Sequence, residues 1–148
     1  MKTIWLSVFL MTSCVTAWFP HQEAVFWGTA GKGAFVLQGL TISTRPTTGD
    51  LQKTALDLAV TAARSSGLIL EESAERSLTV SLDEREFSAD LDTLCSVSVV
   101  IKVWVRGLQI GQVLYSEDTK RTLRSASYLR QVLAAAFARL AQELRNQK

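Results

Sequence analysis

The clearest feature of the chain is a strict alternation of side-chain character along residues 95–106. Cysteine, valine and isoleucine occupy every odd position from Cys95 to Val105, and most of the even positions are polar or charged. Successive side chains of a strand point to opposite faces, and β-branched residues are enriched in strands. The pattern therefore predicts a strand whose valine and isoleucine face is covered by other elements, while its second face is not.

Two segments have the apolar spacing of amphipathic helices, and we expect both to cover that face. The first begins at Asp50, its expected N-cap, and ends before Gly67, which stands where a C-terminal cap belongs. The second begins at Ser125 or Ser127, either of which can cap it. The apolar stripes are Leu51, Ala55, Leu58, Ala59 and Ala62 in the first helix, and Leu129, Val132, Leu133, Ala136, Leu140 and Leu144 in the second.

Further strands are predicted around the central one. Residues 34–44 and 77–83 form two of them, and residues 112–120 return antiparallel to the central strand after a glycine-bracketed turn at residues 107–111. The acidic residues 84–92 are expected to form a hydrophilic connection. The order of elements is then β-α-β-β-β-α. It predicts an α+β two-layer sandwich, with a mostly antiparallel sheet and two helices on one face.

Residues 1–17 have the features of an export signal. Lys2 supplies a basic start, and the apolar run that follows is too short to span a bilayer as a mature anchor. Two processing sites remain open. Val15-Thr16-Ala17 suits ordinary signal peptidase, whereas Met11-Thr12-Ser13-Cys14 is similar to a bacterial lipobox, in which Cys14 would be acylated. We therefore expect an exported protein, either held at a membrane by lipid on Cys14 or soluble in the periplasm.

Residues 18–33 are aromatic at first and then rich in glycine. Pro20 and the glycines favour a flexible, irregular leader over a regular element. The sequence Gly31-Lys32-Gly33 invites comparison with a phosphate-binding loop, but Phe26 stands where the first glycine should be. The remaining residues, 34–148, are long enough to form one α+β domain with an ordinary hydrophobic core.

Charge changes this picture little, because a net charge of +2 gives no general attraction to nucleic acid. The charges are nevertheless segregated along the chain. Residues 71–92 contain eight carboxylates and two arginines, whereas residues 124–148 contain five basic side chains and a single carboxylate, Glu143. We interpret these segments as two solvated faces of the domain.

Catalytic and metal-binding patterns are not found in the sequence. His21 is the only histidine and lies in the leader, which excludes catalytic triads and histidine metal clusters. Cys95 begins the buried row of the central strand and is expected to be a small core residue, not a nucleophile. We expect neither an enzyme nor a bound cofactor or metal.

The most suggestive surface residues are Lys102, Trp104 and Arg106, which fall on the uncovered side of the central strand. A tryptophan between two cations could stack on a partner while the cations meet phosphate or carboxylate groups. The same residues could also form an ordinary solvated face. They are the candidate binding residues for a glycolipid or a partner.

The chain resembles the LptE family of outer-membrane lipoproteins, which act in lipopolysaccharide assembly. The likeness extends over roughly residues 28–146 and follows an export signal with a lipobox-like end. It is carried by the Leu-x-Val-x-Leu strand at residues 78–82, the valine-rich strand at 98–105, the return strand at 111–115 and the helix at 127–144.

This resemblance implies a lipid-anchored protein at the periplasmic face of the outer membrane, attached through Cys14. It would plug a β-barrel translocon of the LptD type and help to deliver lipopolysaccharide or another anionic glycolipid, without catalysing a reaction. A different class of function remains open. The chain could be an auxiliary lipoprotein of an envelope lipid transporter or of a cell-wall synthase, acting as a protein-interaction module.

Overall fold

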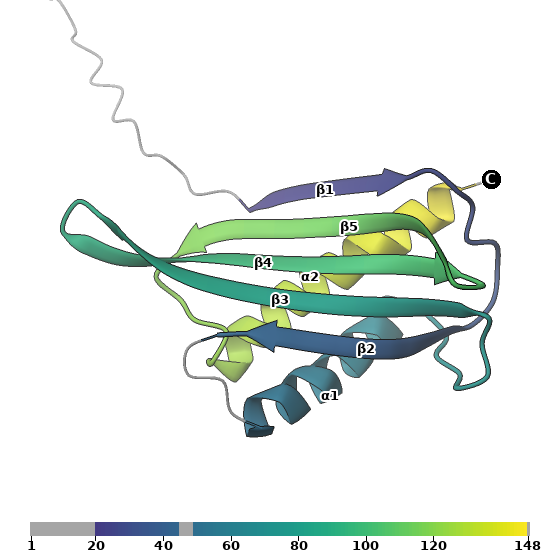
Figure 1. The fold of residues 1–148 in the computed structure, drawn as a ribbon, viewed down its shortest axis with the longest axis horizontal. Coiled ribbons are helices and arrows are strands. Elements are labelled where there is room, and N and C mark those ends of the chain that lie inside the picture. The colour runs from purple at the N-terminus through teal and green to yellow at the C-terminus, as the bar shows by residue number, and fades with distance from the viewer. Residues whose placement is uncertain (1–19, 45–48, 148) are drawn as a thin grey trace, which may run out of the picture.

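The computed structural model describes residues 20–44 and 49–147. They form a five-stranded sheet with the strand order β1-β5-β4-β3-β2 and two helices (Figure 1). Cys14 and both predicted processing sites lie outside the described residues. The elements are β1 (His21–Phe26), β2 (Phe35–Ser43), α1 (Gly49–Ser65), β3 (Arg76–Ala89), β4 (Asp92–Val105), β5 (Leu108–Thr119) and α2 (Ala126–Asn146).

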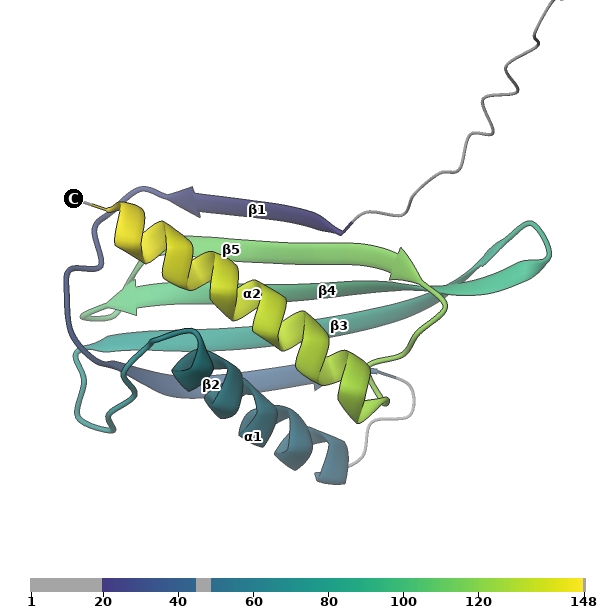
Figure 2. The same ribbon diagram turned by 180° about the vertical axis from the view of Figure 1, so that it is seen from behind.

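Both helices lie on one face of the sheet (Figure 2). The predicted α+β two-layer sandwich is therefore confirmed, and so is the mostly antiparallel sheet, in which only β2 and β3 pair in parallel. The valine and isoleucine row of β4 faces the helices. Val97, Val99, Ile101 and Val103 are completely shielded from solvent, and Cys95 is a buried free cysteine, as expected for a core residue.

The two helices cover different parts of the sheet: α2 packs over β4 and β5, whereas α1 packs over β2 and against α2. Helix α2 presents the predicted stripe together with Tyr128 and Phe137, which the sequence analysis did not include, while Leu144 is only partly buried. The buried residues of α1 are all alanines, so this helix can approach the sheet and α2 closely. Gly67 ends α1 with a φ of +96°, as expected for a C-terminal cap, but Asp50 lies within the first helical turn and is not the N-cap.

The prediction of an irregular leader is wrong for residues 21–26, because β1 pairs with the outer edge of β5 from His21↔Ser116 to Phe26↔Gly111. A Cβ atom at Gly111 would overlap the ring of Phe26, so the glycine makes room for that ring on β5. The indole of Trp27 also donates a hydrogen bond to the carbonyl of Gln109 at 2.8 Å. Pairing with β5, which is far away in the sequence, therefore determines that residues 21–26 form a strand.

The predicted turn at residues 107–111 is shorter in the structure. Arg106 and Gly107 have φ values of +50° and +78°, and two positive φ angles are typical of a two-residue hairpin turn. Strand β5 therefore begins at Leu108. Val103 pairs with Gly111 and Trp104 pairs with Gln109, so a register shift leaves Ile110 as an extra residue in β5.

The predicted hydrophilic connection at residues 84–92 is also wrong. Strands β3 and β4 continue as an antiparallel pair out to Ala89↔Asp92, so most of the acidic segment belongs to a long hairpin. One of its acids has an internal role. Glu84 accepts hydrogen bonds from the hydroxyl of Thr122 at 3.0 Å and from the backbone N–H of Leu123 at 2.6 Å, which holds the loop between β5 and α2.

Replacement of Ile101 by alanine should lower the free energy of unfolding by about 3 kcal/mol, because it leaves a cavity beneath the helices. The matched control is Val100→Ala, one residue away on the opposite face, which should lower it by about 1 kcal/mol or less. Urea titration followed by circular dichroism measures both. Equal losses for the two variants would contradict the assignment of the two faces.

Alkaline pH should destabilise the fold through Tyr115. Burial, followed by the nearby Glu117 carboxylate, raises the pKa of this phenol to about 12, against about 10 in an unfolded chain. The unfolded state therefore loses its proton first. The stabilisation is complete below pH 10 and falls as the pH rises towards 12, by about 1.4 kcal/mol at pH 11. Urea titrations near pH 9 and pH 11 should show a smaller decline for Tyr115→Phe than for the natural chain.

Candidate interaction surface

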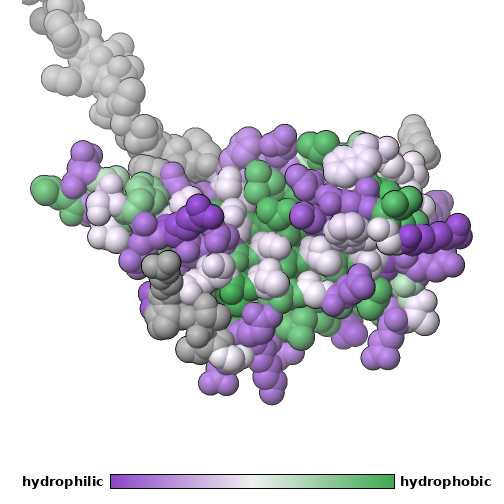
Figure 3. Space-filling view, viewed as in Figure 1, coloured by the Kyte–Doolittle hydropathy of each residue, from purple (hydrophilic) through white to green (hydrophobic). Residues whose placement is uncertain are grey.

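None of the described helices or strands covers the second face of the sheet, which is turned towards the viewer in Figure 3. Hydrophobic side chains gather near its centre, and paler, weakly polar residues surround them. The register explains this pattern. Leu114 of β5 lies beside Val100 of β4, and both point away from the helices because their neighbours Val113 and Val99 point into the core.

Short hydroxyl side chains make up much of the rest of this face. They come from four adjacent strands and share the orientation of Val100, as the register shows: Thr41, Ser43, Ser77, Thr79, Ser81, Ser98 and Ser116. Hydroxyl groups donate and accept hydrogen bonds without bringing charge. The centre of the surface is therefore weakly polar and partly apolar, and charged side chains such as Glu23, Asp83 and Arg85 share its orientation further out. An apolar centre with a polar surround is found at protein interfaces. We call this surface the open face.

Trp104 lies at one end of the open face and is half-buried. Its indole Nε1 donates a hydrogen bond to the Thr79 hydroxyl at 3.1 Å, although its cross-strand partner in the register is Ser77. The ring is therefore laid diagonally across β3 and does not project into solvent. It borders a shallow hollow of about 610 Å³, to which Val36 and Gln38 also contribute.

The same hollow is lined by two carboxylates, Glu72 and Glu75, and by no cationic side chain. Lys102 is half-buried on the open face between Thr79 and Gln112, and it has no ion-pair partner within residues 20–44 and 49–147. Lys102 and Trp104 are thus brought together as expected, but the surroundings of the tryptophan are acidic.

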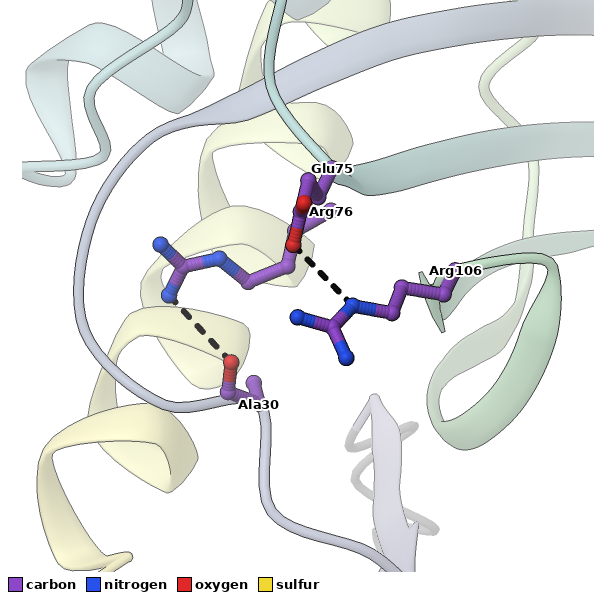
Figure 4. A network of polar contacts seen from close by, with 4 residues as sticks. All are labelled: Ala30, Glu75, Arg76 and Arg106. Carbon is purple, nitrogen blue, oxygen red and sulfur yellow. Dashed lines mark hydrogen bonds and ion pairs between the residues drawn. The ribbon is translucent and has the colours of Figure 1, made fainter.

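Arg106 does not continue the row that the sequence predicted, because it lies in the β4–β5 turn with a positive φ. Its guanidinium Nε lies 3.1 Å from a carboxylate oxygen of Glu75 (Figure 4). Its backbone N–H also donates a hydrogen bond to the Glu75 carbonyl. Both side chains are highly exposed, so this ion pair contributes little stability, about 0–1 kcal/mol. The neighbouring Arg76 points away from the pair and donates to the carbonyl of Ala30 at 3.2 Å.

Two open-face residues, Leu114 and Gln112, were not singled out from the sequence. The signal was present, because Gln112, Leu114 and Ser116 alternate with the buried Val113 and Tyr115. What was missing was the strand order, which places these side chains directly beside those of β4.

Within the described parts of the chain, no group of three or more His, Cys, Asp or Glu side chains could hold a metal ion. His21 lies on the edge strand, with its Nε2 atom 3.7 Å from a carboxylate oxygen of Glu23. Of the helices that the structure describes, none has the length and apolar character needed to span a membrane.

Thr79→Val should lower the free energy of unfolding by about 1 kcal/mol, because the half-buried indole N–H of Trp104 loses its acceptor. Thr41→Val is the matched control. Its hydroxyl is exposed on the edge strand and makes only a long contact of 3.4 Å with Ser81. Urea titration of both variants tests the role of the hydrogen bond. A loss at Thr79 no larger than that at Thr41 would show that it contributes nothing.

No protein-family model matches the chain, and no curated protein matches its sequence. Similarity appears among solved structures. The PelC dodecamer from Paraburkholderia phytofirmans is 14% identical, with a TM-score of 0.57 over 83% of this chain and 98% of the PelC chain. The hypothetical protein CT253 from Chlamydia trachomatis is 13% identical, with a TM-score of 0.45 over 78% of this chain and 95% of that one. At these identities, the similarity to PelC establishes a common fold.

Proposed function

We propose that the chain is a non-catalytic component of the bacterial cell envelope that binds another envelope component through the open face of its sheet. The observation that carries this proposal is the apolar centre of that face, where Val100 and Leu114 lie side by side and are only partly buried. On the same face, Val25 of β1 is 44% exposed and lies opposite Gln112. Apolar side chains left uncovered on a folded domain are typical of an interaction site.

The open face suits a partner that presents a broad, complementary surface. Its strands are held rigid by the core behind them, so little conformational entropy is lost on binding. The hydroxyl side chains supply neutral hydrogen-bonding groups around the apolar centre. No reaction is part of the proposal.

The envelope location rests on the export-signal features of residues 1–17. If Cys14 is acylated, Pro20, where the described structure begins, lies only six positions after it in the sequence. An extended chain of that length spans about 20 Å. The domain would then be held close to the bilayer surface, where it would meet membrane-embedded partners.

The finer proposal is an LptE-type role, which rests on the resemblance of the sequence. The partner would then be an outer-membrane β-barrel of the LptD type, and the ligand would be lipopolysaccharide or another anionic glycolipid. Lys102 and Trp104 are the residues placed to contact it. Arg106 is a weaker candidate, because Glu75 neutralises it and a second carboxylate, Glu72, lines the nearby hollow. The alternative is an interaction module of a lipid transporter or a cell-wall synthase.

The partner can be identified by purifying the full-length chain from detergent-solubilised envelopes of its host and identifying the proteins that accompany it. We expect Leu114→Arg to abolish this co-purification, because it places a charge at the centre of the open face. Leu56→Arg is the matched control, since Leu56 is 41% exposed on α1, behind the sheet.

Three outcomes separate the possibilities. Recovery of a large β-barrel supports the LptE-type role, and recovery of a periplasmic or inner-membrane complex supports the alternative. Retention of the same partner by the Leu114→Arg variant would refute the open face as the binding site. In a parallel assay with vesicles containing lipopolysaccharide, Lys102→Glu should weaken binding about tenfold if a glycolipid is the ligand, whereas Lys53→Glu on α1 should not.

A further inference from the structure

The two ends of the long axis of the molecule carry complementary features. At one end the β3–β4 hairpin extends beyond the rest of the sheet (Figure 1). The pairing of β2 with β3 ends at Ser43↔Asp83, and the pairing of β4 with β5 begins at Cys95↔Thr119. Residues 84–94 therefore form a two-stranded projection, which we call the arm.

The arm is acidic and ends in exposed apolar side chains. It contains four carboxylates and one arginine. Glu86 and Asp90 have no ion-pair partner among the residues that the structure describes. Leu91 at its tip is fully exposed, with a relative exposure of 103%, and Phe87 is 37% exposed. A two-stranded ribbon is only marginally stable in water by itself. Exposed apolar side chains at its tip are typical of an interaction site, which favours a binding role for the arm.

The opposite end contains a depression of about 540 Å³, which we call the basin. The β1–β2 loop, the C-terminal end of α1 and the last turns of α2 form it, and no carboxylate lines it. Its apolar lining includes Phe35, Leu68 and Leu144, with Ile69 59% exposed. Two exposed cations, Lys32 and Arg145, also line it, and neither has an ion-pair partner in the described ranges.

We propose that copies of this chain associate head to tail, with the arm of one copy bound in the basin of the next. Leu91 would enter the apolar part of the basin, while Glu86 and Asp90 would face Lys32 and Arg145. The basin is in the size range of sites that hold a drug-sized ligand, so a hairpin tip with one leucine can enter it. The arm and the basin lie at opposite ends of one molecule, so the contact must be made between molecules.

This contact joins two different surfaces, so a pair of copies retains one free basin and one free arm, on different copies. Such heterologous contacts close into rings or extend into filaments. A membrane surface is the competing occupant of the arm. The carboxylates make it less favourable, because anionic lipids repel Glu86 and Asp90, whereas the basin supplies cations next to apolar side chains. The association does not involve the open face and goes beyond the function proposed above.

Charge exchange between the two surfaces tests the proposal. Sedimentation velocity of the full chain in detergent should show oligomers, which weaken as salt is raised from about 0.15 M to about 1 M. Reversing the charge of the arm with Glu86→Lys and Asp90→Lys should weaken association at least tenfold. Reversing the charge of the basin with Lys32→Glu and Arg145→Glu should have the same effect. Combining both pairs in one chain should restore association. As controls, Asp57→Lys and Lys53→Glu on the exposed side of α1 should change nothing.

A mixing experiment tests the head-to-tail geometry. Leu91→Ser leaves a chain with only a working basin, and Ile69→Asp leaves one with only a working arm. Each alone should be monomeric, and an equimolar mixture should form dimers and nothing larger. A natural chain that stays monomeric, or unchanged association of the arm variants, would overturn the proposal. So would a monomeric chain whose arm binds anionic vesicles in a Leu91-dependent way.

Discussion

The fold depends on covering one row of side chains in β4. Val97, Val99, Ile101 and Val103 are completely buried, and full burial of each such side chain is worth about 1.5–3 kcal/mol. Helix α2 supplies the large side chains that cover them, including Tyr128 and Phe137, and α1 packs with its alanines over β2 and against α2. Since both helices are used on this side, the described elements leave the other face of the sheet open, and that face is the candidate interaction surface.

Polar contacts fix how the helical layer meets the sheet. Tyr128 of α2 donates a hydrogen bond to Glu117 of β5, and Glu84 of β3 holds the loop that leads into α2. Burial, followed by the hydrogen bond to Glu117, raises the pKa of Tyr128 above its usual range, so the phenol remains a donor. These contacts engage the carboxylates of Glu84 and Glu117. Glu86 and Asp90 on the arm have no ion-pair partner among the described residues, so that end of the molecule is acidic.

The part of the candidate site that lies within one strand could be predicted. Lys102 and Trp104 share the open face because they are two residues apart in a regular strand. Arg106 breaks the row, because its backbone adopts the positive φ of the hairpin turn. The contributions of β3 and β5, such as Thr79 and Leu114, could not be assigned from local alternation alone, since it does not say which strands lie side by side. The hydrogen bond that holds Trp104 flat depends on that neighbour relationship.

The sequence by itself determined the periodic elements: the central strand, the two amphipathic helices, the cap at Gly67 and the two-layer class. Each is specified by residues close together in the chain, whose spacing decides which side chains share a face. Only the tertiary structure decided β1, the length of the arm and the separation of arm and basin. Strand β1 is short and has exposed, polar residues, so its place depends on pairing with β5 and on the space that Gly111 leaves for Phe26. Such pairings form between distant residues, and local patterns do not encode them.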